Sequence, residues 1–203
     1  MNAAREKALI RDRMRQSRMQ LDEAWVAVAS AQAERSLMAL EAFARARTVA
    51  CYIALRGEVR TDAILSRCRE ARKEVVLPAA REDGSYAFAV WPDGEPLIEG
   101  ALRTREPAGK RWFAAGEVDL FVVPGVAFDG SGRRIGHGAG HYDKLLADAR
   151  GGERAAWKVG LAFEFQVLPR VPAEERDVPM DVIITEKRIV RCGKTASEKG
   201  RTT

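Results

Sequence analysis

Apolar positions in the first part of the chain recur roughly at the spacing of an α-helix. Residues 3–19 mix apolar and charged side chains in this way, which predicts an amphipathic helix. Asp22 is a suitable N-cap for a second, alanine-rich helix that we expect to end near Ala44. Because no strand lies between the two helices, we expect them to pack as a helical hairpin against the rest of the domain.

From residue 48 onward, short apolar runs replace the helical pattern. Runs of roughly four to eight apolar residues suit buried strands and are too short for helices. The predicted strands are Thr48–Leu55, Glu74–Leu77, Tyr86–Trp91, Asp119–Val123, Val159–Phe163 and Val182–Thr185, with an edge strand at Arg188–Val190. Thr61 is placed to cap a helix between the first two strands, and a later helix is expected from about Tyr142 to Ala149.

Buried strands that alternate with helices predict βαβ units and therefore an α/β fold. We expect a single domain over residues 1–190, built on a mostly parallel, Rossmann-like, doubly wound sheet with helices on both faces and the helical hairpin at its N-terminus. Residues 191–203 are polar and basic, and we expect this tail to be disordered. Ligands of such sheets bind outside the carboxyl ends of the strands, which directs attention to the loops at 56–61 and 124–143.

Composition and charge narrow the function classes. The net charge of the 203 residues is +5, but the positive surplus lies at the two ends of the chain, unlike the basic stripe interleaved with aromatics of a nucleic-acid binder. The sequence contains neither an apolar stretch of membrane-helix length nor a secretory signal pattern. Cys51, Cys68 and Cys192 form no CxxC pair, which argues against a zinc ribbon or a disulfide framework. We therefore expect a cytoplasmic protein without nucleic-acid or membrane partners.

Residues 124–143 are the segment in which chemistry-bearing side chains gather. They contain six of the 17 glycines and both histidines of the chain. A glycine-rich backbone lets several N–H groups converge on one anion, and the start of the following helix adds its own free N–H groups and dipole. Arg133 and Arg134 add positive charge, and Asp143 is a candidate ligand for Mg²⁺. The segment therefore predicts a phosphate-binding loop.

Three sharper motifs fit this segment poorly. The Rossmann fingerprint places its first glycine directly after the strand, whereas Gly136 lies well beyond Val123. The G-K-[S/T] of a Walker A loop is absent. His137 and His141 have the spacing of a zinc-protease pair, but that motif needs a continuous helix and an adjacent glutamate. The two histidines remain either locally hydrogen-bonded loop residues or ligand contacts.

Four motifs in order along the chain resemble those of the 5-formyltetrahydrofolate cyclo-ligase (5,10-methenyltetrahydrofolate synthetase) family. In that family a strand ending in V-P-G-x-A-F-D leads into G-x-R-x-G-x-G-x-G-x-Y-D, here Val123–Asp129 and Gly132–Asp143. The other three elements are Lys7 with Arg11, Tyr52–Thr61, and the D-x-P-x-D block at Asp177–Asp181 followed by Thr185 and Glu186. Four ordered motifs are far more specific than one glycine-rich loop.

The resemblance implies an ATP-consuming ligase that cyclises 5-formyltetrahydrofolate to 5,10-methenyltetrahydrofolate and releases ADP and phosphate through a phosphorylated formyl intermediate. It implies Mg²⁺ as cofactor, held by Asp143 and Asp177, and assigns no single catalytic residue; we expect a monomer. The implied ATP contacts are Lys7, Arg11, Arg134, Ile135, Gly136, His137, Gly138, Ala139, Gly140, His141 and Tyr142. The implied folate contacts are Ile53, Glu58, His137, Gly138, Ala139, Gly140 and His141.

The chain departs from the common family pattern at three folate-side positions. The family often has an aromatic or basic residue at His137, glycine or lysine at Ala139, and an aromatic residue at His141. The aromatic side chains that could line the folate pocket are Trp91, Trp112, Phe128 and Tyr142. The basic N-terminal region could also attract a polyglutamate tail on the folate.

Two other function classes stay open on the residues alone. One is a different α/β enzyme, such as a sugar-phosphate isomerase, which would need no ATP hydrolysis. The other is a non-catalytic protein that binds nucleotide or RNA through its basic chain ends. Release of ADP on addition of the folate distinguishes the ligase from both.

Overall fold

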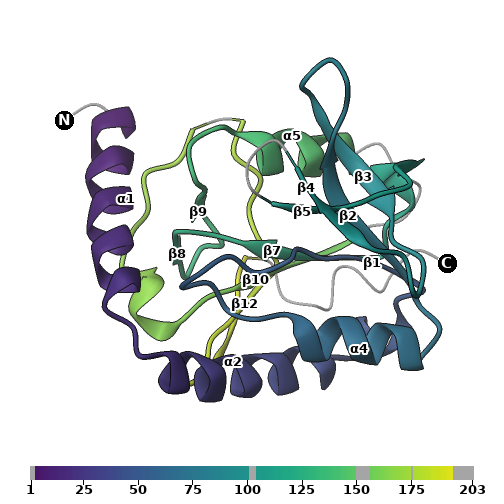
Figure 1. Cartoon of the computed structure of the whole chain (residues 1–203). Coiled ribbons are helices and arrows are strands. Elements are labelled where there is room, and N and C mark those ends of the chain that lie inside the picture. The colour runs from purple at the N-terminus through teal and green to yellow at the C-terminus, as the bar shows by residue number, and fades with distance from the viewer. Residues whose placement is uncertain (1–2, 101–103, 150–155, 175, 194–203) are drawn as a thin grey trace, which may run out of the picture.

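The computed structural model describes residues 3–100, 104–149, 156–174 and 176–193, and its centre is an eight-stranded sheet (Figure 1). In order across the sheet, the strands are β13 (Ile189–Arg191), β12 (Val182–Ile184), β10 (Trp157–Leu161), β7 (Leu120–Pro124), β1 (Thr48–Ala50), β2 (Glu74–Ala80), β3 (Tyr86–Val90) and β6 (Arg111–Phe113). The five neighbours from β12 to β2 are parallel, and the outer strands β13, β3 and β6 pair antiparallel. The predicted mostly parallel α/β sheet is confirmed.

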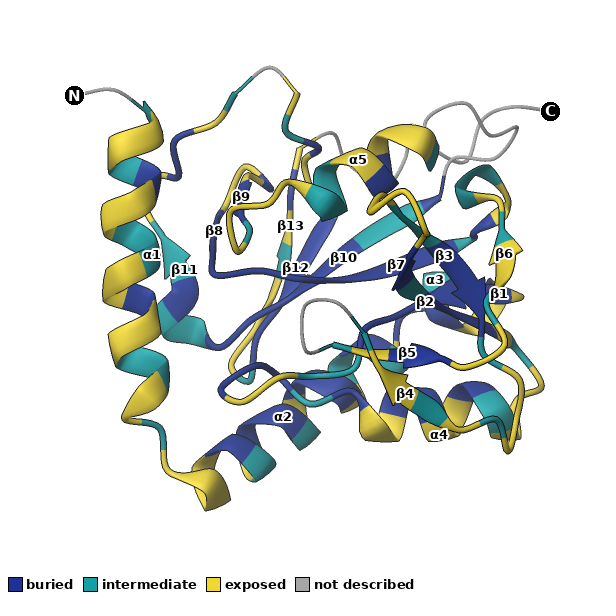
Figure 2. Ribbon diagram, turned by 45° about the horizontal axis from the view of Figure 1, so that its top comes forward, coloured by how far each residue is buried: buried dark blue, intermediate teal, exposed yellow. Residues whose placement is uncertain are grey.

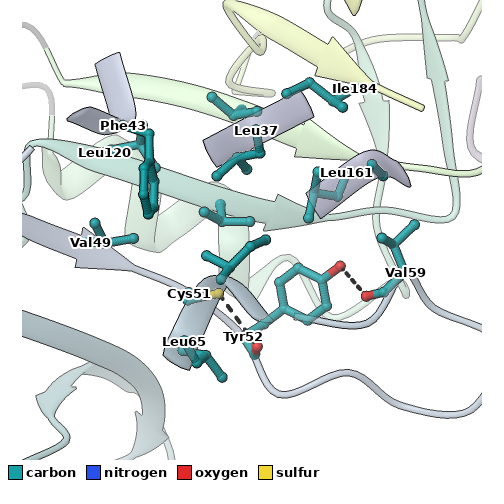
Figure 3. Packing of buried hydrophobic residues seen from close by; sticks show 14 of the residues in the cluster. Leu37, Phe43, Val49, Cys51, Tyr52, Val59, Leu65, Leu120, Leu161 and Ile184 are labelled. Carbon is teal, nitrogen blue, oxygen red and sulfur yellow. Dashed lines mark hydrogen bonds between the residues drawn. The ribbon is translucent and has the colours of Figure 1, made fainter. Parts of the chain in front are cut away.

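Helices cover both faces of this sheet. Helices α2 (Glu23–Met38), α3 (Glu41–Arg45) and α4 (Asp62–Glu70) lie on one face, and α5 (His141–Asp148) lies on the other (Figure 1). Successive side chains of a strand point to opposite faces. Val49 therefore packs in the cluster that contains Leu37 and Leu65, shown in Figure 3, whereas Ala50 packs in the cluster that contains Leu145. Figure 2 shows the resulting arrangement, with buried strands between helices whose outer surfaces are exposed.

Helix α1 (Ala3–Met19) lies apart from α2, so the predicted helical hairpin is wrong. In Figures 1 and 2, α1 stands beside one end of the sheet while α2 runs along one of its faces. Helix α1 buries Met14 in a small cluster with Ile135 and Val171, whereas α2 buries Leu37 against the main sheet. The apolar stripes of the two helices face different partners, and this separates them.

The second helix begins as predicted and ends early. The Asp22 side chain caps α2 by accepting a hydrogen bond from the Trp25 N–H at 2.9 Å. The helix stops at Met38, because Leu40 adopts an extended conformation (φ −69, ψ 137) and buries its side chain in the core. The chain then resumes as the short helix α3.

The side chain of Thr61 does not cap α4, although the residue stands at the N-cap position. Its hydroxyl donates instead to the Tyr52 carbonyl at 2.7 Å. The buried Glu34 carboxylate of α2 takes over the capping, since it accepts the N–H of Ala63 at 2.8 Å. Burial raises the pKa of this carboxyl above its ordinary value.

The predicted strands β7 and β10 are displaced by one and two residues, and the two largest differences from the predicted strand boundaries are in β1 and β2. Strand β1 ends at Ala50 rather than Leu55, and the chain leaves the sheet there. Strand β2 continues through Pro78 to Ala80. Because β1 has already ended opposite Val76, the N–H that a proline lacks is not needed at this position.

The structure also contains short elements that the hydrophobic pattern does not predict. They are the hairpin β4 (Leu97–Glu99) and β5 (Arg105–Pro107), the edge strand β6, the small sheet of β11 (Val167–Leu168), β8 (Ala127–Asp129) and β9 (Arg134–Ile135), and the 3₁₀ turns η1 (Ala115–Glu117) and η3 (Glu164–Gln166). Segment 124–143 is therefore not a simple loop, because it contains the β8–β9 hairpin. Two or three residues are too few to show a period.

The C-terminal region is ordered slightly beyond residue 190. Arg191 pairs with Val182 in the edge strand β13, and Cys192 is buried. The rest of the predicted disordered tail, 194–203, lies outside the described residues. Among the residues that the structure describes, no helix is long and apolar enough to cross a membrane.

Candidate functional site

Two cavities lie at the carboxyl ends of the parallel strands, on either side of residues 134–143. The first, of about 380 Å³, is lined largely by rings and aliphatic side chains and is called the apolar cavity below. The second, of about 490 Å³, contains Lys7 and Arg11 and is called the cationic cavity. The residues that line both are Arg134, Gly136, Ala139, Gly140 and Asp143. The glycine-rich segment is thus a shared wall.

The backbone of this wall requires glycine at two positions. Gly138 has φ +117 and Gly140 has φ +70, in the region that residues with a Cβ atom rarely adopt. Gly140 is the N-cap of α5, and no side chain caps that end of the helix. The first N–H groups of α5 are therefore available to an anion in the adjoining cavity.

Arg134 joins the two ends of the wall. It is buried, and its Nη2 donates to the Asp143 Oδ1 at 2.8 Å. A Cβ atom at Gly136 would lie 2.7 Å from Arg134 Nη1, so glycine leaves the space that the guanidinium occupies. The cation is fixed between the cavities by its carboxylate partner.

Helix α1 supplies two further cations to the cationic cavity. Lys7 is only 7% exposed, and its Nζ lies 2.7 Å from Asp177 Oδ2 and 3.4 Å from Glu174 Oε1. One turn later, the Arg11 Nε donates to the Gly136 carbonyl at 2.9 Å. Burial alone would raise the pKa of Asp177, but hydrogen bonds from Lys7 and from the Glu174 N–H hold it below its ordinary value.

Glu58 lies at the edge of the apolar cavity and is 5% exposed. Its Oε1 is 2.9 Å from His137 Nε2 and 3.7 Å from Arg18 Nη1, and its Oε2 accepts the Leu55 N–H at 3.0 Å. Gly57, with φ +77, allows the turn that directs this carboxylate inward. Sequence reasoning missed Arg18, because an arginine on a basic helix looks like part of a solvated face.

The predicted ATP contacts divide between the two cavities. Lys7, Arg11, Ile135 and Gly138 line the cationic cavity and not the apolar cavity. His137, His141 and Tyr142 line the apolar cavity, together with the predicted folate contacts Ile53 and Glu58. The structure therefore brings all these residues to one site. However, it places three of the predicted ATP contacts, His137, His141 and Tyr142, on the apolar side of the wall and not on the cationic side.

Only Tyr142 of the four predicted aromatic residues lines the apolar cavity. Trp91 lies under the Arg69 side chain of α4, Trp112 lies under the Arg81 side chain just after β2, and Phe128 is fully buried. Tyr52 and Tyr86 line the cavity in their place. The rings of Tyr86 and His141 stack with their centroids 4.3 Å apart. Burial raises the pKa of both Tyr52 and Tyr142 well above the ordinary phenol value, so these phenols stay neutral.

Asp143 and Asp177 both line the cationic cavity, each paired with a cation of the protein. Among the residues that the structure describes, no group of three or more metal-ligating side chains gathers at one point. Mg²⁺ usually binds to one or two carboxylates together with phosphate oxygens and water. The two carboxylates therefore fit a Mg²⁺ ion that arrives with a polyphosphate, and they do not form a complete metal site by themselves.

Known proteins resemble this chain in both sequence and fold. Residues 3–186 match the model of the 5-formyltetrahydrofolate cyclo-ligase family. The probable 5-formyltetrahydrofolate cyclo-ligase of Caenorhabditis elegans is 32% identical over 155 residues, which cover 71% of this chain and 75% of that protein. The 5-formyltetrahydrofolate cyclo-ligase of Escherichia coli K12 is 28% identical over 162 residues, 78% of this chain and 88% of that protein.

A solved structure agrees with these matches. The 5,10-methenyltetrahydrofolate synthetase of Aquifex aeolicus superposes with a TM-score of 0.81 at 31% identity, over 93% of this chain and 95% of that one. The motifs at the shared wall lie inside the matched region. The chain belongs to the 5-formyltetrahydrofolate cyclo-ligase family, a family of ligases.

Proposed function

We propose that the protein cyclises 5-formyltetrahydrofolate to 5,10-methenyltetrahydrofolate in a reaction that depends on ATP and Mg²⁺ and releases ADP and phosphate. The observation that carries the proposal is the wall shared by the apolar and the cationic cavity. A flat ring system in the first cavity and a polyphosphate in the second would meet across Gly136, Ala139 and Gly140. This arrangement suits transfer of a phosphoryl group between the two substrates.

The cationic cavity suits the phosphates of ATP. Lys7, Arg11 and Arg134 supply three positive charges, and the amides around Gly138 and Gly140 supply hydrogen-bond donors. Phosphoryl transfer needs mainly positioning and stabilisation of charge, which these groups can provide. Asp143 and Asp177 would hold the Mg²⁺ ion, which when bound neutralises part of the charge on the phosphates.

The apolar cavity suits the folate. Its volume lies in the range typical of small-molecule sites. Tyr52, Tyr142 and Ile53 offer flat and aliphatic surfaces to a ring, and the Glu58 carboxylate can accept hydrogen bonds from the N–H groups of the pterin. The ring stack of Tyr86 and His141 forms a further part of this surface.

The proposed chemistry explains why ATP is used for a cyclisation. The formyl oxygen attacks the γ-phosphorus of ATP, and the bond between that phosphorus and ADP breaks. Phosphorylation turns the formyl oxygen into a leaving group. N10 of the folate then attacks the formyl carbon and loses its proton, and the carbon–oxygen bond breaks to release phosphate. Arg134, buried between the cavities, is placed to stabilise the charge that moves across the wall.

A near-ultraviolet absorbance assay tests the proposal, because the methenyl product absorbs where the substrate does not. We expect absorbance to rise only when ATP and Mg²⁺ are both present, with release of ADP. Lys7→Ala and Glu58→Ala should weaken the rise, whereas Arg13→Ala, which changes an exposed residue of α1, should not. Turnover without ADP release would favour another α/β enzyme. Folded protein that binds ATP without forming product would contradict the proposed chemistry.

We also propose that the basic surface of the enzyme near Arg15 and Arg56 attracts polyglutamylated folate. Arg15 and Arg56 line a cavity of about 160 Å³ beside Glu58. Attraction between exposed charges is screened by salt. We therefore expect a lower KM for the polyglutamylated than for the monoglutamylated substrate, and the difference between the two KM values should decrease as the salt concentration rises. Equal KM values at low salt would contradict the proposed attraction.

We also propose that the enzyme is a cytoplasmic monomer without nucleic-acid partners. Sedimentation analysis of the purified protein should give the mass of one chain, and the mass of a dimer would contradict the proposed monomer.

A further inference from the structure

Arg18 is a buried cation in the last turn of α1 that the family motifs do not include. Its side chain is only 10% exposed, although it stands on a helix rich in solvated arginines. Its Nη2 donates to the Gly125 carbonyl at the end of β7, and its Nη1 lies 3.7 Å from Glu58 Oε1. The guanidinium therefore connects three separate segments at the edge of the apolar cavity.

The backbone around Glu58 is packed directly on Arg18. A Cβ atom at Gly57 would lie 3.0 Å from the Arg18 Cβ, so the turn that carries Glu58 rests on the last turn of α1. The Leu55 N–H holds the second carboxylate oxygen of Glu58 at 3.0 Å. The Leu55 N–H thus orients the carboxylate through a hydrogen bond, and the Arg18 guanidinium places a positive charge 3.7 Å from its other oxygen.

Arg18 and Glu58 are opposite charges that lie close together with little exposure to solvent. Burial lowers the pKa of Arg18, and the neighbouring Glu58 raises it again in part. The other titratable groups around the Glu58 carboxylate are His137 at 2.9 Å, the neutral phenols of Tyr52 and Tyr142, and the three arginines that line the cavity of about 160 Å³ with it, Arg11, Arg15 and Arg56. A buried carboxylate that loses its cation is costly to keep inside the protein.

We propose that Arg18 is a positioning residue that holds Glu58 as an oriented, charged acceptor for the pterin ring. The proposal rests on the proposed function, since that function assigns the pterin to Glu58. Arg18 lines neither the apolar nor the cationic cavity, so it acts on the pterin through Glu58 and leaves the ATP side of the wall unchanged. His137 sits on the same oxygen of Glu58 but is largely exposed, so it does not replace the buried cation.

The test compares Arg18→Met with Arg18→Lys, and uses Arg13→Met as a matched control on an exposed position of the same helix. In Arg18→Met we expect the KM for 5-formyltetrahydrofolate to rise about tenfold with the KM for ATP unchanged. Arg18→Lys should recover part of the lost folate affinity, because it restores the charge, and Arg13→Met should match the wild type.

A double-mutant cycle separates positioning from general stability. In a Glu58→Gln background, Arg18→Met should add little to the loss of folate affinity, because the charge that Arg18 serves has been removed. Folate affinity is also measured by fluorescence titration without ATP, so that the inference is tested even if the wild type forms no methenyl product. Parallel increases in both KM values, or additive effects of the two substitutions, would overturn the role of Arg18. If Arg18→Met does not fold, Arg18→Gln, which also removes the charge, takes its place in both comparisons.

Discussion

Arg134 Nη2 lies 2.8 Å from Asp143 Oδ1, and this ion pair connects β9 to the first turn of α5 across the wall that both cavities share. Arg134 is buried, whereas about a fifth of the Asp143 side chain remains exposed (22%). The carboxylate therefore neutralises a buried cation and still faces the cationic cavity. Removing either partner would leave a charge inside the wall, which is more costly than losing an exposed pair.

The first prediction concerns the metal requirement. Asp143→Asn should raise the Mg²⁺ concentration for half-maximal activity about tenfold or more, because an amide is a weaker ligand for Mg²⁺ than a carboxylate. The KM for the folate should change much less. Asp148→Asn, at the exposed far end of α5, is the control and should titrate with Mg²⁺ like the wild type. A Mg²⁺ titration of Asp143→Asn that superposes on the wild-type curve would remove this carboxylate from the metal site.

The second prediction concerns the pH dependence of stability through Glu34. Burial raises the pKa of this carboxyl above 4.5, so the folded protein binds a proton there more readily than the unfolded chain. The contribution of Glu34 to stability is therefore full below about pH 4.5 and is lost as the pH rises through the higher folded pKa. Urea unfolding of Glu34→Gln should lack this loss. If the free energy of unfolding of Glu34→Gln changed with pH as steeply as that of the wild type, the pH dependence would come from other groups.

The parallel core of the fold and the position of the site could be predicted from the sequence. The five residues of β7 are all buried, and such a continuous apolar run reads as a strand covered on both faces. Because parallel strands end at one edge, the loops after β1 and β7 had to lie at the same edge of the sheet. The glycine-rich segment could thus be placed at the edge that carries Glu58, whereas the direct pairing of β1 with β7 was not predicted.

Other features of the fold and the site depend on tertiary contacts, which leave no local pattern in the sequence. Strands β8 and β9 are too short to show a period, so their hairpin was hidden inside the glycine-rich segment. Thr61 is a good N-cap by type, but Glu34 from another helix reaches the N–H groups of α4 instead. Arg18 looks like its exposed neighbours until Gly57 and Glu58 are packed on it.

The third prediction uses the histidine that stands where the family often has an aromatic ring. His141 stacks on Tyr86, so it already supplies a flat surface to the apolar cavity. His141→Phe keeps a ring and should leave the KM for 5-formyltetrahydrofolate within about twofold of the wild type, whereas His141→Ala should raise it several-fold. The KM for ATP should stay at the wild-type value in both variants. Equal folate KM values in the two variants would mean that the stack plays no part in binding.

The last prediction tests how tightly the start of the glycine-rich segment is packed. The ring of Phe128 is fully buried between two glycines: a Cβ atom at Gly125 would lie 2.4 Å from its Cζ, and one at Gly160 would lie 2.6 Å from its Cε1. The ring has no room to move away, so Gly125→Ala should destabilise the fold by about 1–3 kcal/mol. Gly130→Ala is the matched control, because a Cβ atom there meets nothing within 4 Å. Thermal unfolding should show a lower Tm, by roughly 2–4 °C per kcal/mol, for Gly125→Ala alone. Equal Tm values for the two variants would show that the backbone at Gly125 can shift, and that Phe128 does not fix the wall of the site.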